Sequence, residues 1–369
     1  MKTTRLTIAG ILGLFLSFVR PALPAQTRPS KAGEPPATKN KPAPQEESEV
    51  PLLPSVLDFE KHRNLPIFRV DGRTITLGNL ARHLRTHLDP EVEERWTRPE
   101  GRRELNSPDL PRRAYEFADL LALLAEAKRQ RLPLADYGKR LEARMEEDFR
   151  TRYLPAYAKK TGHPPTKASI PDLRRRHRRS RGLQVEIQTL LSYLVPDRYT
   201  TSEVKRFYYR HGDWFGGKVR VAHILVSFRD PANGRLKQGA SLFEARQKVV
   251  RILDKLEKDA SNFGDLAKKY SDDKISAQRG GVLGWLDRFE PYVPASVLRT
   301  AWALKDGQVS SPIESFYGKH LVLRIKFIQN HFILPSPKQM PLIRKIYHRF
   351  QKEEFLFGVR KRHKIERFL

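Results

Sequence analysis

The spacing of apolar residues near the start of the chain changes from a strand pattern to a helix pattern. Apolar and polar residues alternate on both sides of Asp71 and Gly72, a dipeptide that readily takes the positive φ angles of a two-residue turn. The pattern predicts a tight β-hairpin. Thr76 follows it and is placed to cap a helix that starts near Gly78, because its hydroxyl can accept a hydrogen bond from the first turn.

Helical spacing then dominates the next hundred or so residues. Apolar side chains recur at helical intervals between residues 113 and 131, and Pro133 ends the run. Similar amphipathic patterns predict helices over 137–153 and 183–194. Residues 201–203, Thr-Ser-Glu, predict the capped start of a further short helix.

The last segment, residues 339–368, predicts a basic helix with one apolar stripe. The stripe consists of Leu342, Ile346, Phe350, Phe355 and Val359. Two placements fit this pattern: the helix packs on the earlier helices, or it stands as an independent terminal helix.

Between the helical parts, residues 219–327 contain two strand-like segments with one histidine each, His223 and His320. The connecting sequence includes Gly280, Gly281 and Gly284. Their spacing matches neither the Rossmann nor the P-loop phosphate-binding pattern, so the glycines are expected in turns or at close backbone contacts.

The N-terminus has the pattern of a signal peptide over residues 1–25. Lys2 and Arg5 precede an apolar run from 6 to 19, which is shorter than the roughly 20 residues of a membrane-spanning helix, and a small-residue exit follows. Export is the expected outcome, and retention as an uncleaved anchor is the alternative. Residues 26–55 are rich in proline, lysine and glutamate and predict a disordered linker.

Composition adds two constraints. The chain has no cysteine, so disulfides and cysteine metal sites are excluded, and its formal charge of +28 favours contact with polyanions such as an anionic membrane surface. The densest basic run, residues 174–181, lacks the interleaved aromatic residues that stack on bases. It is expected to be a solvated helix face or loop, and no nucleic-acid partner is expected.

The strand-rich region resembles parvulin-type peptidyl-prolyl isomerases. The resemblance lies in Val-Arg-Val-Ala-His-Ile-Leu-Val at 219–226, Gly-Gly-Val-Leu-Gly-Trp at 280–285 and Phe-Tyr-Gly-Lys-His-Leu-Val-Leu at 316–323. Looser motifs at 70–77, 123–128 and 202–208 resemble the chaperone region of SurA-type proteins. Together they place the chain near the SurA/PrsA-like foldases.

This resemblance implies an α+β fold, in which a parvulin domain with a small antiparallel sheet covered by helices is inserted in or follows a mainly helical chaperone domain. The implied boundaries are 56–217 for the chaperone domain and 218–330 for the parvulin domain. Residues 331–369 would form a C-terminal helix packing on the chaperone domain.

The same resemblance implies a site. His223, Asp273 and His320 would be the catalytic residues, and substrate would contact Leu283, Val293, Val297 and Tyr317, with Tyr292 replacing Val293 if the loop is shifted by one residue. Asp273 is expected in an exposed loop, where its substitution changes rate more than stability. The residues themselves also allow purely structural interpretations. The two histidines can be hydrogen-bonded core residues, and Asp273 can belong to a turn. No third ligand accompanies the histidines, so neither a metal nor a cofactor is expected.

The implied function is that of an exported folding factor of the periplasm or cell envelope. It would catalyse cis-trans isomerisation of Xaa-Pro bonds and bind unfolded or partly folded exported proteins. The alternative is a binding-only chaperone whose parvulin domain has weak or no activity. A basic envelope scaffold is a third reading, which rests on charge alone.

Overall fold

The computed structural model describes residues 53–331 and 333–369. The expected signal peptide at 1–25 and most of the expected linker at 26–55 lie outside the described residues. Within the described ranges, no helix combines the length and the apolar character needed to cross a bilayer.

The predicted hairpin is present. Strands β1 (Pro66–Val70) and β2 (Arg73–Thr76) pair antiparallel, and the two linking residues both have positive φ, 49° at Asp71 and 80° at Gly72. A type I′ turn requires this conformation at both central positions. Thr76 caps helix α2 (Leu77–His87) and forms a reciprocal capping box with Asn79. The predicted cap is therefore confirmed, with the helix starting one residue earlier than expected.

Eight further helices belong to the part of the described chain before the second sheet. They are α1 (Phe59–His62), α3 (Val92–Thr97), α4 (Pro99–Leu105), α5 (Asp109–Arg129), α6 (Tyr137–Asp148), α7 (Leu154–Thr161), α8 (Ile170–Leu194) and α9 (Thr201–Arg210). A π-helical turn, Phe149–Tyr153, joins α6 to α7, and short 3₁₀ turns occupy Lys167–Ser169, Gly212–Trp214 and Ala260–Asn262. Most buried apolar residues of α2, α5 and α8 share one core with the hairpin.

The predicted start of one helix in this part was wrong, and that of another was confirmed. Helix α8 begins at Ile170 rather than near residue 183, because the basic run is helical too. Helix α9 begins at Thr201 with a capping box, as predicted, and the two residues of that box are Thr200 and Glu203.

The basic run of α8 is paired as well as solvated. Arg174, Arg178 and Arg181 form ion pairs with carboxylates of α6, and His177, 1% exposed, contacts Asp148 at 2.9 Å. The acidic side chains of α6 therefore neutralise part of this charge, which the isolated run did not reveal.

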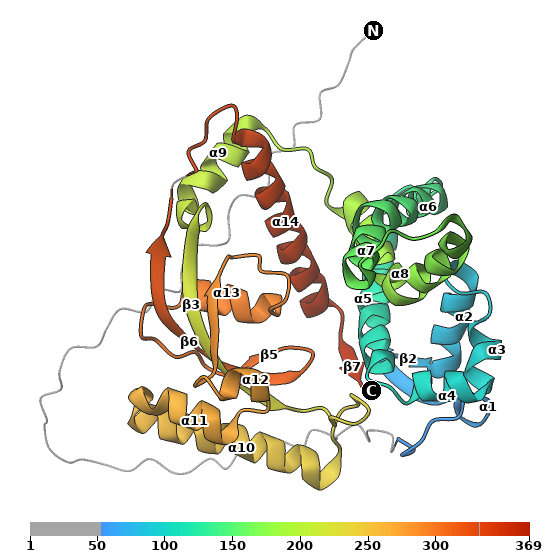
Figure 1. The fold of residues 1–369 in the computed structure, drawn as a ribbon, viewed down its shortest axis with the longest axis horizontal. Helices are drawn as coiled ribbons and strands as arrows, with labels where there is room; N and C mark the ends of the chain where they lie inside the picture. Colours follow the sequence, from blue (N-terminus) through green and yellow to red (C-terminus); the bar gives the residue numbers. More distant parts are fainter. Residues whose placement is uncertain (1–52, 332) are drawn as a thin grey trace, which may run out of the picture. The chain divides into compact units, whose positions relative to one another are not determined.

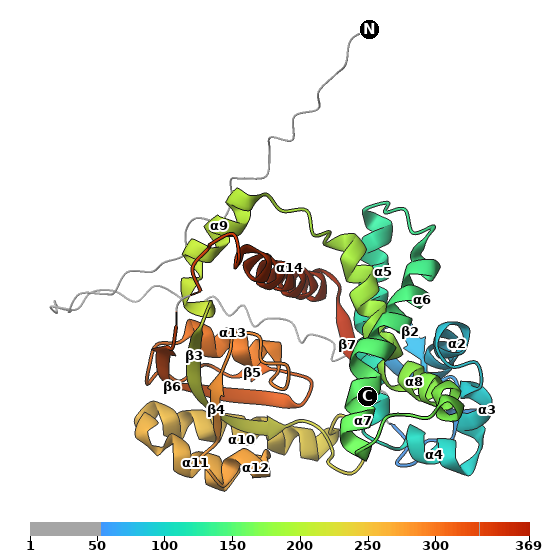
Figure 2. The same cartoon turned by 45° about the horizontal axis from the view of Figure 1, so that its top comes forward.

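A second antiparallel sheet has the strand order β4-β3-β6-β5, from β3 (Gly217–Ser227), β4 (Val282–Leu286), β5 (Ile313–Glu314) and β6 (Gly318–Gln329). Its helices are α10 (Gly239–Lys258), α11 (Phe263–Tyr270), α12 (Lys274–Ala277) and α13 (Ala295–Ala303). Helices α10 and α11 cover one face and α13 packs on the other (Figure 2). The expected α+β class, with a small antiparallel sheet covered by helices next to a helical region, is confirmed.

The C-terminal segment returns to the first part of the described chain (Figure 1). Helix α14 (Met340–Arg362) contacts α5 and α9, and Arg360 donates to both carboxylate oxygens of Asp119 on α5. The chain then leaves the helix, and β7 (Ile365–Arg367) pairs antiparallel with β1. The prediction of helix up to residue 368 was therefore wrong, because the edge of β1 offered a hydrogen-bonding partner for an extended chain.

The buried face of α14 also differs in part from the predicted stripe. Leu342 is 39% exposed, whereas its neighbour Ile343 is fully buried against residues of α9. Val359 is fully buried in the core shared by α5 and α8, as the stripe predicted. The two ends of α14 thus contact different apolar clusters.

Replacing Val359 by alanine should lower the free energy of unfolding by about 2 kcal/mol, because the change removes two buried methyl groups and leaves a small cavity. The matched control is Leu342→Ala on the same helix, whose side chain is partly in solvent and whose loss should cost well under half as much. Urea denaturation followed by circular dichroism measures both. Equal effects would contradict the packing of α14 described above.

Candidate active site

The two predicted histidines lie on adjacent central strands. In the pairing of β3 with β6, His223 faces Val322 and His320 faces Leu225, so the histidines are diagonal neighbours. Directly opposed residues project from the same face of a sheet, as do residues two apart on one strand. Both side chains therefore lie on the face that α13 covers, beyond the apolar cluster of Val219, Val221 and Val322.

The imidazole rings contact each other in the interior. Their centroids are 5.3 Å apart with an angle of 30° between the ring planes, and the two Nδ1 atoms are 3.2 Å apart. His223 is 6% exposed and His320 is 2% exposed. Such burial is tolerated only when the polar ring atoms find partners.

Asp273 reaches His223 because the segment before α12 covers the open edge of β3. Strand β4 pairs with β3 only as far as Ala222. Beyond it, the side chains of Ser271 and Asp272 accept hydrogen bonds from β3 backbone amides. The next residue, Asp273, then lies beside the His223 ring, with its Oδ2 at 2.9 Å from Nε2.

Gly281 makes this arrangement sterically possible. Its carbonyl accepts the His223 N–H, its φ is 81°, and a Cβ at this position would lie 2.3 Å from the His223 carbonyl oxygen. Only glycine fits there. The expectation of a close-packing role for this glycine is confirmed.

Two serines complete the network, and sequence reasoning missed both. The Ser276 hydroxyl donates to Asp273 Oδ2 at 2.6 Å and lies 3.2 Å from His223 Nε2. The Ser315 hydroxyl lies 2.7 Å from His320 Nε2 and accepts a hydrogen bond from the Tyr317 amide. The only signal for Ser276 was its place three residues after a capping aspartate. Ser315 had none, because the turn between β5 and β6 brings it to His320.

The network fits one set of proton positions. The Asp273 carboxylate accepts from His223 Nε2–H, so His223 Nδ1 is an acceptor. His320 then donates through Nδ1–H, and its Nε2 accepts from the Ser315 hydroxyl. Every polar ring atom is satisfied while both histidines stay neutral.

Electrostatics support this assignment. Desolvation by burial lowers the pKa of His223, although Asp273 opposes the effect. Burial, reinforced by the neighbouring His223, lowers the pKa of His320 to about 3. Burial alone would raise the pKa of Asp273, but hydrogen bonds from Ser276 and His223 outweigh it and hold that pKa below its usual value. At neutral pH the group is a carboxylate beside two neutral imidazoles.

Asp273 differs from its expected setting. It is the N-cap of α12, its Oδ1 accepts from the amides of Ile275 and Ser276, and its side chain is only 26% exposed. Asp273 is thus more exposed than either histidine, as expected, but it caps a helix instead of lying in a free loop. Because one carboxylate both caps α12 and anchors a buried histidine, we now expect its loss to lower stability as well as rate.

The residues expected to contact substrate differ in how deeply they are buried. Leu283 and Val293 are partly buried against the cluster beneath α13, whereas Val297 is 0% exposed. Val297 can therefore support the apolar wall but cannot touch a bound peptide in this structure. Tyr317 is 51% exposed and Tyr292 is 92% exposed. Both tyrosines are accessible, as rim residues must be.

In residues 53–331 and 333–369, no group of three or more histidine, aspartate or glutamate side chains could hold a metal ion. The site offers two neutral imidazoles in a hydrogen-bond network that ends in one carboxylate, next to partly buried apolar side chains.

Comparison with known proteins gives this region a family. Residues 223–326 match the model of the PPIC-type PPIase domain, a rotamase. The chain is 32% identical over 143 residues to the foldase protein PrsA of Bacillus subtilis, covering 38% of this chain and 40% of the relative, and 33% identical over 103 residues to PrsA of Staphylococcus aureus, covering 28% and 31%. The chain thus spans at most about two fifths of the length of these relatives.

Solved structures give similar neighbours. A PpiC-type isomerase domain aligns over 32% of this chain and 97% of its own, with 20% identity and a TM-score of 0.27. PrsA from Bacillus anthracis aligns over 67% and 95%, with 18% identity and a TM-score of 0.28. From the sequence matches and the antiparallel sheet with its paired histidines, residues 223–326 are a parvulin-type, or PPIC-type, peptidyl-prolyl isomerase domain related to that of the PrsA foldases.

Proposed function

We propose that this protein catalyses the cis-trans isomerisation of Xaa-Pro bonds in unfolded or partly folded polypeptides and binds those polypeptides as a folding factor. The observation that carries the proposal is the continuous network Asp273–His223–His320–Ser315 inside a PPIC-type domain. Its members come from positions up to 97 residues apart, and all of them meet in one hydrogen-bonded cluster around the two buried histidines.

The reaction needs no covalent step. The barrier of roughly 18 to 20 kcal/mol arises from amide resonance, which is lost as the C–N bond twists. A site lowers it by favouring the twisted amide over the planar one. Fixed dipoles do this well, because they need no reorganisation when the carbonyl rotates and the nitrogen regains its lone pair. A satisfied, neutral imidazole pair is such a fixed set of dipoles.

In this proposal, apolar residues contact and hold the proline ring. Leu283 and Val293 form the proposed wall, Val297 supports it from below, and Tyr317 with Tyr292 forms the rim. His223, Asp273 and His320 are the proposed catalytic group, in which Asp273 acts through His223 and through its charge.

One observation favours the alternative of a binding-only chaperone. The proposed wall relies on the short side chain of Val293, since Val297 is fully buried. A short wall holds the proline ring loosely, and a loosely held ring gains little from the dipoles beneath it. Turnover on a small peptide decides between the two functions.

The proposal also includes the cellular location and the clients of the protein. The signal-like N-terminus supports an exported protein of the periplasm or cell envelope. A charge of +28 favours contact with an anionic membrane surface. Unfolded exported proteins are the proposed clients.

Asp273→Asn should reduce isomerase turnover by roughly 10- to 100-fold, less than the loss of a direct oxyanion donor, while asparagine keeps the cap of α12. Asp273→Ala should in addition lower the free energy of unfolding by about 1 to 3 kcal/mol, because the cap and the partner of a buried N–H are both lost. A protease-coupled assay on a proline tetrapeptide, alongside denaturation curves, measures both.

The control is Asp265→Asn, an exposed carboxylate of α11 in the same domain. Full turnover in Asp273→Asn would remove the carboxylate from the mechanism. No turnover in the wild type would favour the binding-only alternative.

Stability should fall as pH decreases from about 6.5 towards 3. The unfolded state takes up a proton on His320 near pH 6.5, whereas the folded state holds that pKa at about 3. The unfolded state therefore binds more protons in this window, and each pH unit costs up to about 1.4 kcal/mol at this group. His320→Asn should flatten the dependence, whereas the exposed His163→Asn should not; equal slopes in all three proteins would show that His320 is not held neutral by the fold.

Client binding should survive the loss of isomerase turnover. Asp273→Asn is expected to suppress aggregation of an unfolded client as well as the wild type does, because the substitution leaves the helical part of the chain unchanged. Light scattering of a thermally unfolding client measures this, with a protein that lacks chaperone activity as control. Holding activity lost in parallel with turnover would place client binding at the histidine site.

A further inference from the structure

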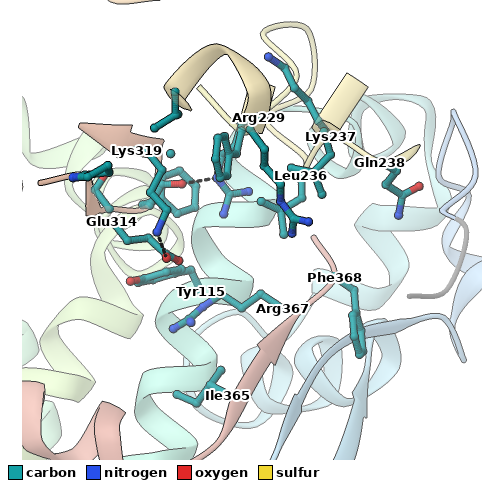
Figure 3. A pocket seen from close by; sticks show the side chains of 18 of the residues that line it. Tyr115, Arg229, Leu236, Lys237, Gln238, Glu314, Lys319, Ile365, Arg367 and Phe368 are labelled. Atoms are coloured by element: carbon teal, nitrogen blue, oxygen red, sulfur yellow. Dashed lines mark hydrogen bonds and ion pairs between the residues drawn. The ribbon is translucent and has the colours of Figure 1, made fainter. Parts of the chain in front are cut away.

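A cavity of about 700 Å³ lies next to the histidine network, between side chains of the isomerase domain and of the helical part. Its walls include Phe316 and residues of α10. Figure 3 shows Tyr115 of α5, Arg229 after β3 and Arg367 of β7 around it. The volume is in the range of roughly 300 to 1,000 Å³ that is typical of ligand sites. Ser315 is its one residue in common with the network.

The charged side chains around the cavity have almost one sign. Five are basic, Arg229, Lys237, Arg246, Lys319 and Arg367. The one acidic residue in the lining, Glu314, already pairs with Lys319 at 2.9 Å. The cavity is therefore a concave surface of positive potential, which favours anionic ligands.

Arg229 is the most unusual of these cations, because it is only 6% exposed. Its guanidinium donates to the carbonyls of Phe316 and Gly234 and lies 3.7 Å from the centre of the Phe316 ring. In the described part of the chain it has no carboxylate partner. Burial, reinforced by the charge of Arg367, lowers the pKa of Arg229 to about 10.

Arg367 is the second under-paired cation. Its Nε and one Nη are buried without a hydrogen-bond partner. Asp119 lies 3.6 Å away, but Arg360 already occupies both of its oxygens. The Arg367 guanidinium stacks on Tyr115 at 3.9 Å, and Tyr115 contacts Phe316. Cation–π contacts offset only part of the cost of desolvating a charge, so a carboxylate entering the cavity would gain Arg229 and Arg367 as partners. Arg246, which lines the cavity from α10 and is exposed, is placed to be the third.

The other residues that line the cavity indicate which kind of molecule would bring this carboxylate. Leu242, Val249, Val250 and Leu253 of α10 present an aliphatic wall, and Val250 is 49% exposed. Strand β7 is an edge of its sheet and borders the cavity (Figure 3). An edge strand can hydrogen-bond an extended peptide, and an aliphatic wall can bury its side chains. A free inorganic anion would use neither feature.

We propose that this cavity binds an extended segment of an unfolded polypeptide in which a glutamate or aspartate carboxylate lies among aliphatic side chains. The carboxylate pairs with Arg229, Arg246 and Arg367, and the aliphatic residues pack on α10. This assignment rests on the proposed role in client binding and defines which client segments are preferred. It requires no proline, so it is separate from the substrate of the histidine site.

The test uses the full chain and two fluorescent ten-residue peptides of alanine, leucine, valine and serine, one with a central glutamate and one with glutamine. The wild type should bind the glutamate peptide about tenfold more tightly, as one good ion pair provides. Arg246→Glu should abolish this preference, and Arg251→Glu, on an exposed part of the same helix outside the cavity, should retain it. Fluorescence anisotropy at physiological salt measures each affinity.

Arg367→Met should also abolish the preference, and Arg246→Glu keeps the proposal testable if that variant does not fold. Equal binding of the two peptides by the wild type would overturn the assignment. Equal loss in Arg246→Glu and Arg251→Glu would do the same, since it would show general attraction to a basic protein. Displacement of the glutamate peptide by millimolar inorganic phosphate would reassign the cavity to phosphate.

Isomerase turnover separates this proposal from the proposed function. Arg246 does not contact the histidine network, so Arg246→Glu should isomerise a proline tetrapeptide at the wild-type rate. A wild type that lacks turnover but prefers the glutamate peptide would refute the isomerase alone. A wild type with turnover and no preference would refute the cavity assignment alone.

Discussion

The register between β3 and β6 is the constraint on which the isomerase domain depends. Eleven residues of β3, from Gly217 to Ser227, pair with β6. A slip of one residue would turn His320 away from His223 and place it among the residues packed under α10 and α11. Apolar residues on both faces oppose such a slip, since Ile224 and Leu321 fill one core and Val221 and Val322 the other. The core packing thereby fixes the geometry of the polar network.

Burial of the histidine pair creates a second requirement, that every ring nitrogen has a partner. Both imidazoles are at most 6% exposed, and an unsatisfied buried donor or acceptor costs about 1 to 3 kcal/mol. Asp273, Ser276 and Ser315 meet this requirement without protonating either ring. The same contacts that keep the domain stable therefore fix the tautomers that the proposed chemistry uses. Stability and turnover are coupled here, and substitutions must be chosen to separate them.

In the helical part of the chain, carboxylates pair with several of the basic side chains. Carboxylates of α6 neutralise much of the basic run on α8, and Asp119 neutralises Arg360. Around the cavity beside α10, basic side chains outnumber acidic ones five to one. Basic side chains are thus paired on α8 and at Arg360, whereas they exceed acidic ones around the cavity, where the chain also presents an aliphatic wall. This combination is what we propose clients recognise.

The sequence by itself determined the features that depend on neighbouring residues. The type I′ hairpin follows from Asp71 and Gly72, the start of α2 follows from Thr76 and Asn79, and the helical spacing identified α5 and α6. The two histidines and Asp273 were found because a motif carries its residues in fixed local contexts. Tertiary structure alone decided the rest. Residues 365–367 became a strand because β1 had a free edge, Ser315 joined the site because a turn brought it to His320, and Val297 was buried because α13 packs that side against the sheet. These outcomes depend on which distant surfaces meet, and the spacing of residues along one chain does not encode that directly.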